Sequence, residues 1–129
     1  MGTSTKKGIA PASAKAKGRA FQQFVRDKIR GILKSYGVVC EDVESRGMGQ
    51  QGSDIILSPL AKRFLPVEIE CKSLAKSAIY GPYEQAKTHG DLEPVVAIKA
   101  NRKEPLVVIS LDYYLYLEQR RLEREHLYD

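Results

Sequence analysis

The chain has 129 residues, of which 43% are hydrophobic and 29% are charged. This length allows one domain with a hydrophobic core but not two ordinary domains, and the composition excludes disordered and fibrous proteins. No apolar run approaches the roughly 20 residues that a membrane helix needs, so we expect no membrane partner. The two cysteines, Cys40 and Cys71, do not form a Cys-x-x-Cys pair, which indicates a reducing compartment, and we expect a cytoplasmic protein.

The positive charge is concentrated at the start of the chain. Residues 1–34 hold nine Lys/Arg and one acid, Asp27, whereas residues 35–129 hold twelve Lys/Arg and fifteen acids. A basic segment of this kind suits a polyanion, most often nucleic acid, and the alternative is a solvated tail without a partner. We predict a flexible basic segment at residues 1–17, followed by a single domain at residues 18–129.

The first part of the domain predicts a helix, a strand and a loop. From Gly18 onward, apolar residues recur at three- and four-residue steps, as on a helix with one buried face, and Gly37 suits the end of that helix. Residues 37–43 then predict a first strand. Residues 45–53 are polar and contain three glycines, which predicts a loop.

Two further strands follow this loop. Residues 54–58 form a short apolar run that Pro59 ends, and residues 60–63 predict a turn. Residues 64–72 predict a third strand, because from Val67 onward apolar and charged side chains alternate, as on a strand with two different faces.

The remaining elements are a helix, two strands and a last helix. Pro82 suits the first turn of a helix at residues 83–89. Residues 94–99 and 106–109 predict strands, and Ser110 or Asp112 suits the N-cap of the last helix. The order α-β-β-β-α-β-β-α predicts an α/β fold of the mixed, α+β kind.

The alternating segment carries three charges on one face: Glu68, Glu70 and Lys72. Burying them in a central strand would cost several kcal/mol unless they are paired or bind a metal ion. The alternative is an edge strand with a solvated polar face. Asp54 favours a site, because hairpin pairing can bring it beside Glu70. Two carboxylates suit a hard cation such as Mg²⁺, and a neighbouring lysine can orient water or neutralise charge on a phosphate.

In this order of strands, Asp54 followed sixteen positions later by Glu70-Cys71-Lys72 resembles the PD-(D/E)xK nuclease superfamily. The proline of that motif is absent, since Ser53 precedes Asp54. Residues 45–59 and 64–73, together with residues 83–86 of the next helix, resemble small endonucleases encoded by bacteriophages. Residues 17–22 are similar to the first helix of archaeal-type Holliday junction resolvases. The resemblance implies a restriction-endonuclease-like core.

The resemblance also implies roles for individual residues. Asp54, Glu70 and the backbone carbonyl of Cys71 would bind Mg²⁺, for which Mn²⁺ could substitute, and Lys72 would position the attacking water. Two glutamines, Gln22 and Gln85, would support the site, with Gln22 standing where the resolvases usually carry a metal-supporting Glu. Further supporting candidates are Ser53 and Glu68, although Glu68 is also interpreted as a solvated charge.

The expected DNA contacts come from the basic segment, the glycine-rich loop and one lysine beyond the third strand. They are Lys6, Lys7, Lys15, Lys17, Arg19, Arg46, Gln50 and Lys76. We therefore predict a metal-dependent DNA endonuclease, with branched DNA and a Holliday junction resolvase as the leading hypothesis and a homodimer as the expected assembly. The alternatives are a phage nuclease that nicks or degrades ordinary duplex DNA, and a nucleic-acid-binding module of the same fold that does not cut.

Overall fold

The computed structural model describes residues 11–127, which divide into two compact units, one ending at Ser73 and one starting at Leu74. The first unit contains α1 (Pro11–Leu33), η2 (Lys34–Tyr36), η3 (Cys40–Asp42), β1 (Val43–Ser45), β2 (Ile55–Leu57) and α2 (Pro59–Phe64). The second contains α3 (Tyr80–Lys87), β3 (Val96–Ile98), β4 (Leu106–Val108) and α4 (Leu111–Glu125). This content confirms a mixed α+β protein. Within the described part of the chain, no helix combines the length and apolar character needed to cross a membrane.

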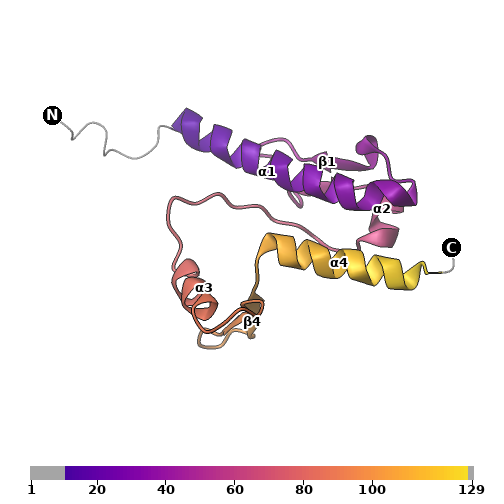
Figure 1. Cartoon of the computed structure of the whole chain (residues 1–129). Helices are drawn as coiled ribbons and strands as arrows, with labels where there is room; N and C mark the ends of the chain where they lie inside the picture. The colour runs from indigo at the N-terminus through magenta and orange to yellow at the C-terminus, as the bar shows by residue number, and fades with distance from the viewer. Residues whose placement is uncertain (1–10, 128–129) are drawn as a thin grey trace. The chain divides into compact units, whose positions relative to one another are not determined.

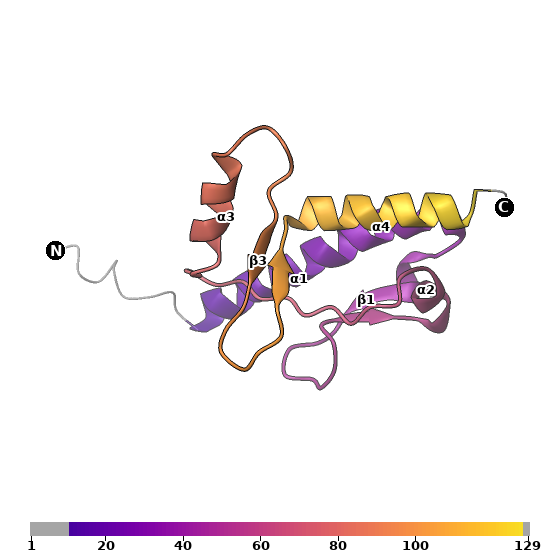
Figure 2. The same cartoon turned by 90° about the horizontal axis from the view of Figure 1, so that it is seen from below.

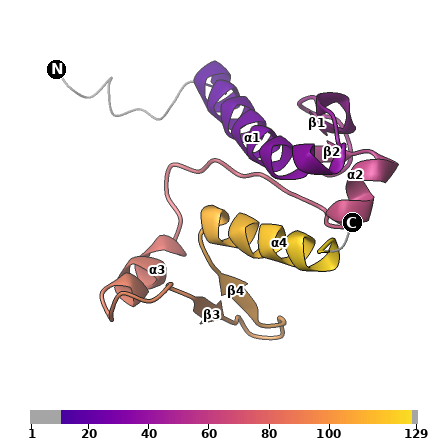
Figure 3. The same ribbon diagram turned by 45° about the vertical axis from the view of Figure 1, so that its right-hand side comes forward.

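The core of the first unit forms where α1 lies along a two-stranded antiparallel sheet (Figure 1). The buried side chains of α1 follow four-residue steps through Val25, Ile29 and Leu33, as the apolar period predicts. In the sheet, Val43 pairs with Leu57 and Ser45 pairs with Ile55. β1, β2 and α2 lie beside the C-terminal half of α1 (Figure 3). The core therefore fixes the start of β2, which is where Asp54 lies.

The helix α1 begins at Pro11, earlier than the predicted start at Gly18. Residues 11–17 lack the apolar period that we used to find the helix, but proline suits a first turn and alanine has the highest helix propensity. The predicted flexible segment is thus helical from Pro11 onward. Residues 1–10 lie outside the described residues.

Two local predictions in the first unit were wrong. Residues 40–42 form the short helix η3 rather than part of a strand, because the carboxylate of Asp42 accepts a hydrogen bond from the Val39 N–H. The predicted turn after Pro59 is the helix α2, in which the Ser58 hydroxyl accepts a hydrogen bond from the Ala61 N–H. Proline ends the strand here, but it also starts a helix.

Phe64, where the predicted third strand begins, is the last residue of α2. The segment at residues 67–72 is not a regular strand, so the predicted third strand and the restriction-endonuclease-like order are not confirmed. Its alternation is present nevertheless: Val67, Ile69 and Cys71 are half-buried, and the three charged residues between and after them are exposed. The backbone N–H of Cys71 donates to the side chain of Asp54 instead of a neighbouring carbonyl, which interrupts a regular ladder.

In the second unit, the antiparallel hairpin of β3 and β4 leads into α4, and α3 lies next to β3 (Figure 2). Both strands lie inside the predicted ranges, and α3 begins three residues before the predicted start at Tyr83. The hydroxyl of Ser110 caps α4 by accepting a hydrogen bond from the Tyr113 N–H, which confirms one of the two predicted caps. The described strands thus form two separate two-stranded sheets instead of one mixed sheet.

Candidate active site

The candidate active site is built where the start of β2 meets the segment at residues 68–72. The backbone N–H of Asp54 donates to the carbonyl of Ile69 over 3.0 Å, and Oδ2 of Asp54 accepts from the N–H of Cys71 over 2.7 Å. These two hydrogen bonds place the Asp54 carboxylate at the residue between Glu70 and Lys72. The structure thereby brings together the acid of the loop–strand junction and the Glu-Cys-Lys triplet.

The two carboxylates act on a common neighbour, the thiol of Cys71. Burial is the main cause that raises the pKa of Cys71 from its ordinary value of 9.0 to about 11, and the negative charges of Asp54 and Glu70 raise it further. Both carboxylates therefore lie within electrostatic reach of one half-buried side chain. The thiol stays protonated at neutral pH.

Several oxygen atoms at this site remain available to a ligand. Asp54 is half-buried, and within the described residues its Oδ1 has no hydrogen-bond partner, whereas Oδ2 accepts from Cys71. Glu70 and Lys72 are exposed, and neither forms an ion pair with another described residue. Glu70 and Lys72 thus face solvent on either side of Cys71, whose N–H donates to the half-buried carboxylate of Asp54.

The acidic set fits a magnesium-type site better than a zinc-type site. In the described part of the chain, no three His, Cys, Asp or Glu side chains gather into a metal-binding cluster. Mg²⁺ is usually held by one or two carboxylates and keeps several waters, whereas structural Zn²⁺ takes four protein ligands. Asp54, Glu70 and the carbonyl of Cys71 are all oxygen donors, so the residues present fit Mg²⁺ or Mn²⁺.

Gln22 lies against the backbone of the candidate site. Its side chain is 5% exposed, and its Nε2 donates to the carbonyl oxygen of Arg46 over 3.0 Å and to that of Asp54 over 2.6 Å. The amide nitrogen is therefore occupied by two backbone acceptors. Gln22 supports the site by tying α1 to the backbone of Asp54. A signal for this was present in the sequence, because Gln22 precedes Val25 and Ile29 on the buried row of α1.

Arg46 closes the base of the glycine-rich loop. Its backbone N–H donates to the Asp54 carbonyl over 2.8 Å, and its Nε donates to the Ser53 carbonyl over 2.7 Å. Gly52 makes room for the guanidinium: a Cβ there would lie 2.7 Å from Cζ of Arg46, and the φ of Gly52 is +112°. The DNA contact of Arg46 stays a prediction. The structure adds a role that the sequence did not reveal, because Arg46 binds the backbone carbonyls of Ser53 and Asp54.

Ser53 and Glu68 interact with each other. The hydroxyl of Ser53 donates a hydrogen bond to Oε1 of Glu68, which links the loop to the start of the charged segment. Glu68 is exposed, and the hydroxyl that donates to it is neutral, so its negative charge is not compensated by Ser53. The two interpretations of Glu68, as a supporting acid and as a solvated charge, both stay predictions.

The other candidate residues lie apart from this cluster along the chain. Lys15, Lys17 and Arg19 are exposed on α1, and Gln50 is exposed in the loop. Gln85, on α3, and Lys76 are exposed residues of the second unit. Lys6 and Lys7 lie outside the described residues.

Comparison with known proteins gives no match: no family model fits this sequence, and no curated protein or solved structure is significantly similar to it.

Proposed function

We propose that this chain is a metal-dependent DNA endonuclease that hydrolyses phosphodiester bonds. The observation that supports the proposal is the hydrogen bond from the Cys71 N–H to Oδ2 of Asp54, which places this carboxylate beside Glu70 and Lys72. The basic balance of residues 1–34 supports DNA as the substrate, because cations supply affinity for a phosphate backbone without reading sequence.

The chain's own residues divide the work. Asp54 and Glu70, with the Cys71 carbonyl, would hold a divalent cation. When bound, that cation supplies Lewis-acid stabilisation of the negative charge that develops on the attacked phosphate. The ammonium group of Lys72 orients the attacking water and adds positive charge near the phosphate. Gln22 and Arg46 keep the backbone of Asp54 in place, because the Gln22 side-chain amide and the Arg46 backbone N–H both donate hydrogen bonds to its carbonyl.

Within this class, the narrower proposal is a Holliday junction resolvase that acts as a homodimer. Its support is the resemblance of residues 17–22 to the first helix of archaeal-type resolvases. Resolution of a four-way junction needs paired cuts on opposite strands, and a two-fold dimer supplies two sites in a constant relation. The corresponding interface would bury roughly 1,200 Å² or more.

One observation favours the alternative of a binding module that does not cut. The buried Gln22 brings no negative charge to the site, and its amide nitrogen is committed to two carbonyl groups. A site with only two carboxylates attracts cations more weakly than a site with three.

The experiment that separates these functions is a cleavage assay on four-way, flapped and linear DNA, each with and without Mg²⁺, combined with light scattering at micromolar concentration. The resolvase proposal predicts a dimer that cuts the four-way junction fastest and only with the cation. A monomer that nicks linear duplex equally fast would support a general nuclease instead. DNA binding without any cutting would support the binding module.

A further inference from the structure

The cations of α1 fall into two groups that differ in their partners. In the C-terminal half, Nε of Arg26 donates to Oδ1 of Asp27 over 2.9 Å, and Arg30 bonds the Val43 carbonyl and forms a 3.4 Å ion pair with Glu44. These charges are compensated within the protein, and they tie α1 to β1. They leave little net positive charge for an external partner.

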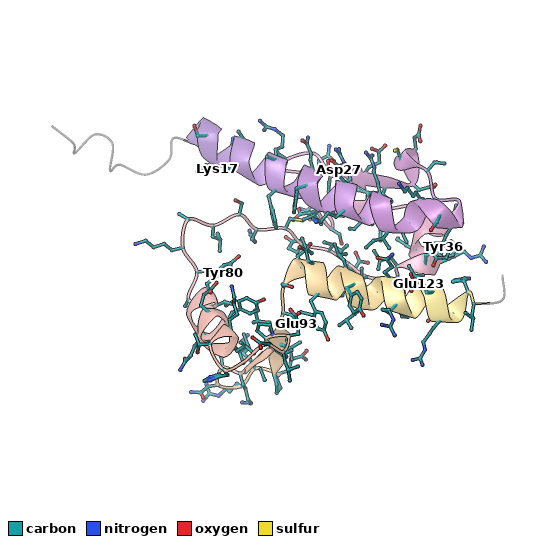
Figure 4. All side chains as sticks on the ribbon, in the orientation of Figure 1. Lys17, Asp27, Tyr36, Tyr80, Glu93 and Glu123 are labelled. Carbon is teal, nitrogen blue, oxygen red and sulfur yellow. The ribbon has the colours of Figure 1, made fainter. Side chains whose placement is uncertain are left out.

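The N-terminal half of α1 has no such compensation. Between Pro11 and Arg26 the sequence contains no acidic residue, and Lys15, Lys17 and Arg19 are all exposed. None of the three forms an ion pair with another described residue. In Figure 4, Lys17 lies near the start of α1 and Asp27 further along the helix.

The three uncompensated cations do not share one side of the helix. Lys15, Arg19 and Gln22 follow the i, i+4, i+7 spacing of a single helix row, and Arg19 is about 4.5 Å along the axis from Gln22. Lys17 is rotated by about 160° from Arg19, toward the opposite side. Because Gln22 bonds the Asp54 carbonyl, the row of Lys15 and Arg19 leads directly to the candidate site.

The glycine-rich loop continues this surface. A Cβ on Gly18 would lie 4.0 Å from Cε of Met48, so this part of α1 lies close to the tip of the loop. In the loop, Gly49 has a φ of +80° and Gly52 a φ of +112°, conformations that glycine adopts without strain, and both residues are exposed.

We propose that Lys15 and Arg19, with the adjoining loop, hold the phosphate backbone of DNA and lead the strand to Asp54, Glu70 and Lys72. The partner is a DNA strand because its repeating negative charges complement a helix end that has no acid of its own. This inference rests on the proposed function for the identity of the substrate, and it goes further by assigning the contact to one side of α1. Two exposed cations of α2 in the same unit, Lys62 and Arg63, lie outside this row, and neither forms an ion pair with another described residue.

The test measures binding without cutting, using the full chain with Asp54→Asn and a fluorescent four-way junction, by anisotropy between 50 and 300 mM salt in Mg²⁺. The Lys15→Ala/Arg19→Ala pair is compared with the Lys62→Ala/Arg63→Ala pair, which removes the same charge. We expect roughly tenfold weaker binding and a salt slope shallower by up to about 1.8 for the first pair, and less than about threefold weakening for the second.

Equal weakening by both pairs would show diffuse attraction and would overturn the proposal, as would an unchanged affinity of the first pair. Thermal unfolding of each variant shows whether it remains folded. A separate cleavage assay on the wild-type chain distinguishes the two proposals. If the binding contrast is present and wild type does not cut, the surface stands and the endonuclease fails. If wild type cuts and the contrast is absent, the endonuclease stands and the surface fails.

Discussion

Oδ2 of Asp54 accepts a hydrogen bond from the backbone N–H of Cys71 over 2.7 Å. The same residue donates its own N–H to the Ile69 carbonyl, so the backbone and the side chain of Asp54 both contact the charged segment. The carboxylate is thus oriented by a hydrogen bond within the protein, independently of any ligand. We therefore make separate predictions about the stability of the fold and about the chemistry of the site.

The first prediction separates the hydrogen bond from the charge of Asp54. Asp54→Asn keeps an oxygen that can accept from Cys71, so we expect the free energy of unfolding to change by less than about 1 kcal/mol. Asp54→Ala removes the acceptor and leaves the Cys71 N–H without it, at a cost of about 1–2 kcal/mol. Urea unfolding measures both values. Equal destabilisation by the two variants would show that the hydrogen bond contributes nothing.

The second prediction concerns the amide of Gln22. Its Nε2 donates to two carbonyl groups, whereas an ionised Glu has no hydrogen to donate and would place its charge against the same oxygens. We expect Gln22→Met to cost about 1–2 kcal/mol and Gln22→Glu about 3 kcal/mol at pH 7.

The pH dependence of Gln22→Glu gives a control. Burial beside two carbonyl oxygens raises the pKa of the introduced Glu, so the folded state binds its proton more tightly than the unfolded state. The extra loss in free energy of unfolding caused by the Glu charge is therefore absent at low pH. It begins as the pH rises above the unfolded-state pKa of about 4.3 and is complete above the raised folded-state pKa. If Gln22→Glu is as stable as wild type at pH 7, the two hydrogen bonds from the Gln22 amide do not stabilise the fold.

The third prediction tests the close approach of Gly52 and Arg46. Alanine at position 52 would have to adopt a φ near +112°, and its Cβ would lie 2.7 Å from Cζ of Arg46. We expect Gly52→Ala to lower the free energy of unfolding by about 1–3 kcal/mol. Gly31→Ala is the matched control, because a Cβ there meets nothing within 4 Å in the exposed part of a helix. Thermal unfolding should show Gly31→Ala to be more stable by about 0.5–1 kcal/mol.

The fourth prediction uses the two free cysteines. Cys40 is exposed and Cys71 is half-buried, with burial and two nearby carboxylates raising the pKa of Cys71 to about 11. A rise of two pKa units lowers the thiolate fraction at pH 8 by about a hundredfold. Iodoacetamide with mass spectrometry should therefore label Cys40 well before Cys71. In a Cys40→Ser background, Asp54→Asn should accelerate labelling of Cys71, and equal rates at the two cysteines would contradict the described geometry.

The sequence predicted the parts of the fold that depend on local patterns. The apolar row of α1, the positions of β2, β3 and β4 and the Ser110 cap follow from periodicity and capping chemistry. The alternation at residues 67–72 also predicted which side chains are exposed. These features depend on residues a few positions apart.

The parts that the sequence did not predict depend on competing partners. The Cys71 N–H binds a side chain instead of a strand, and the Val39 N–H binds Asp42, so an extended pattern did not become a strand at either place. The roles of Gln22 and Arg46 depend on contacts across 32 and 7 residues with the backbone around Asp54. Periodicity alone does not identify such partners.

The proposal that Asp54 and Glu70 hold the catalytic cation is tested most sharply by single-turnover cleavage of labelled DNA in Mg²⁺. The rates of Asp54→Asn and Glu70→Gln are measured, with Glu41→Gln as the control. Glu41 is an exposed acid of the same unit, outside the site. We expect wild type and the control to cut at similar rates, and both carboxylate variants to lose at least about a hundredfold in rate. Excess chelator should stop all cutting. Cleavage that persists in chelator, or an Asp54→Asn variant as active as wild type, would contradict the proposal.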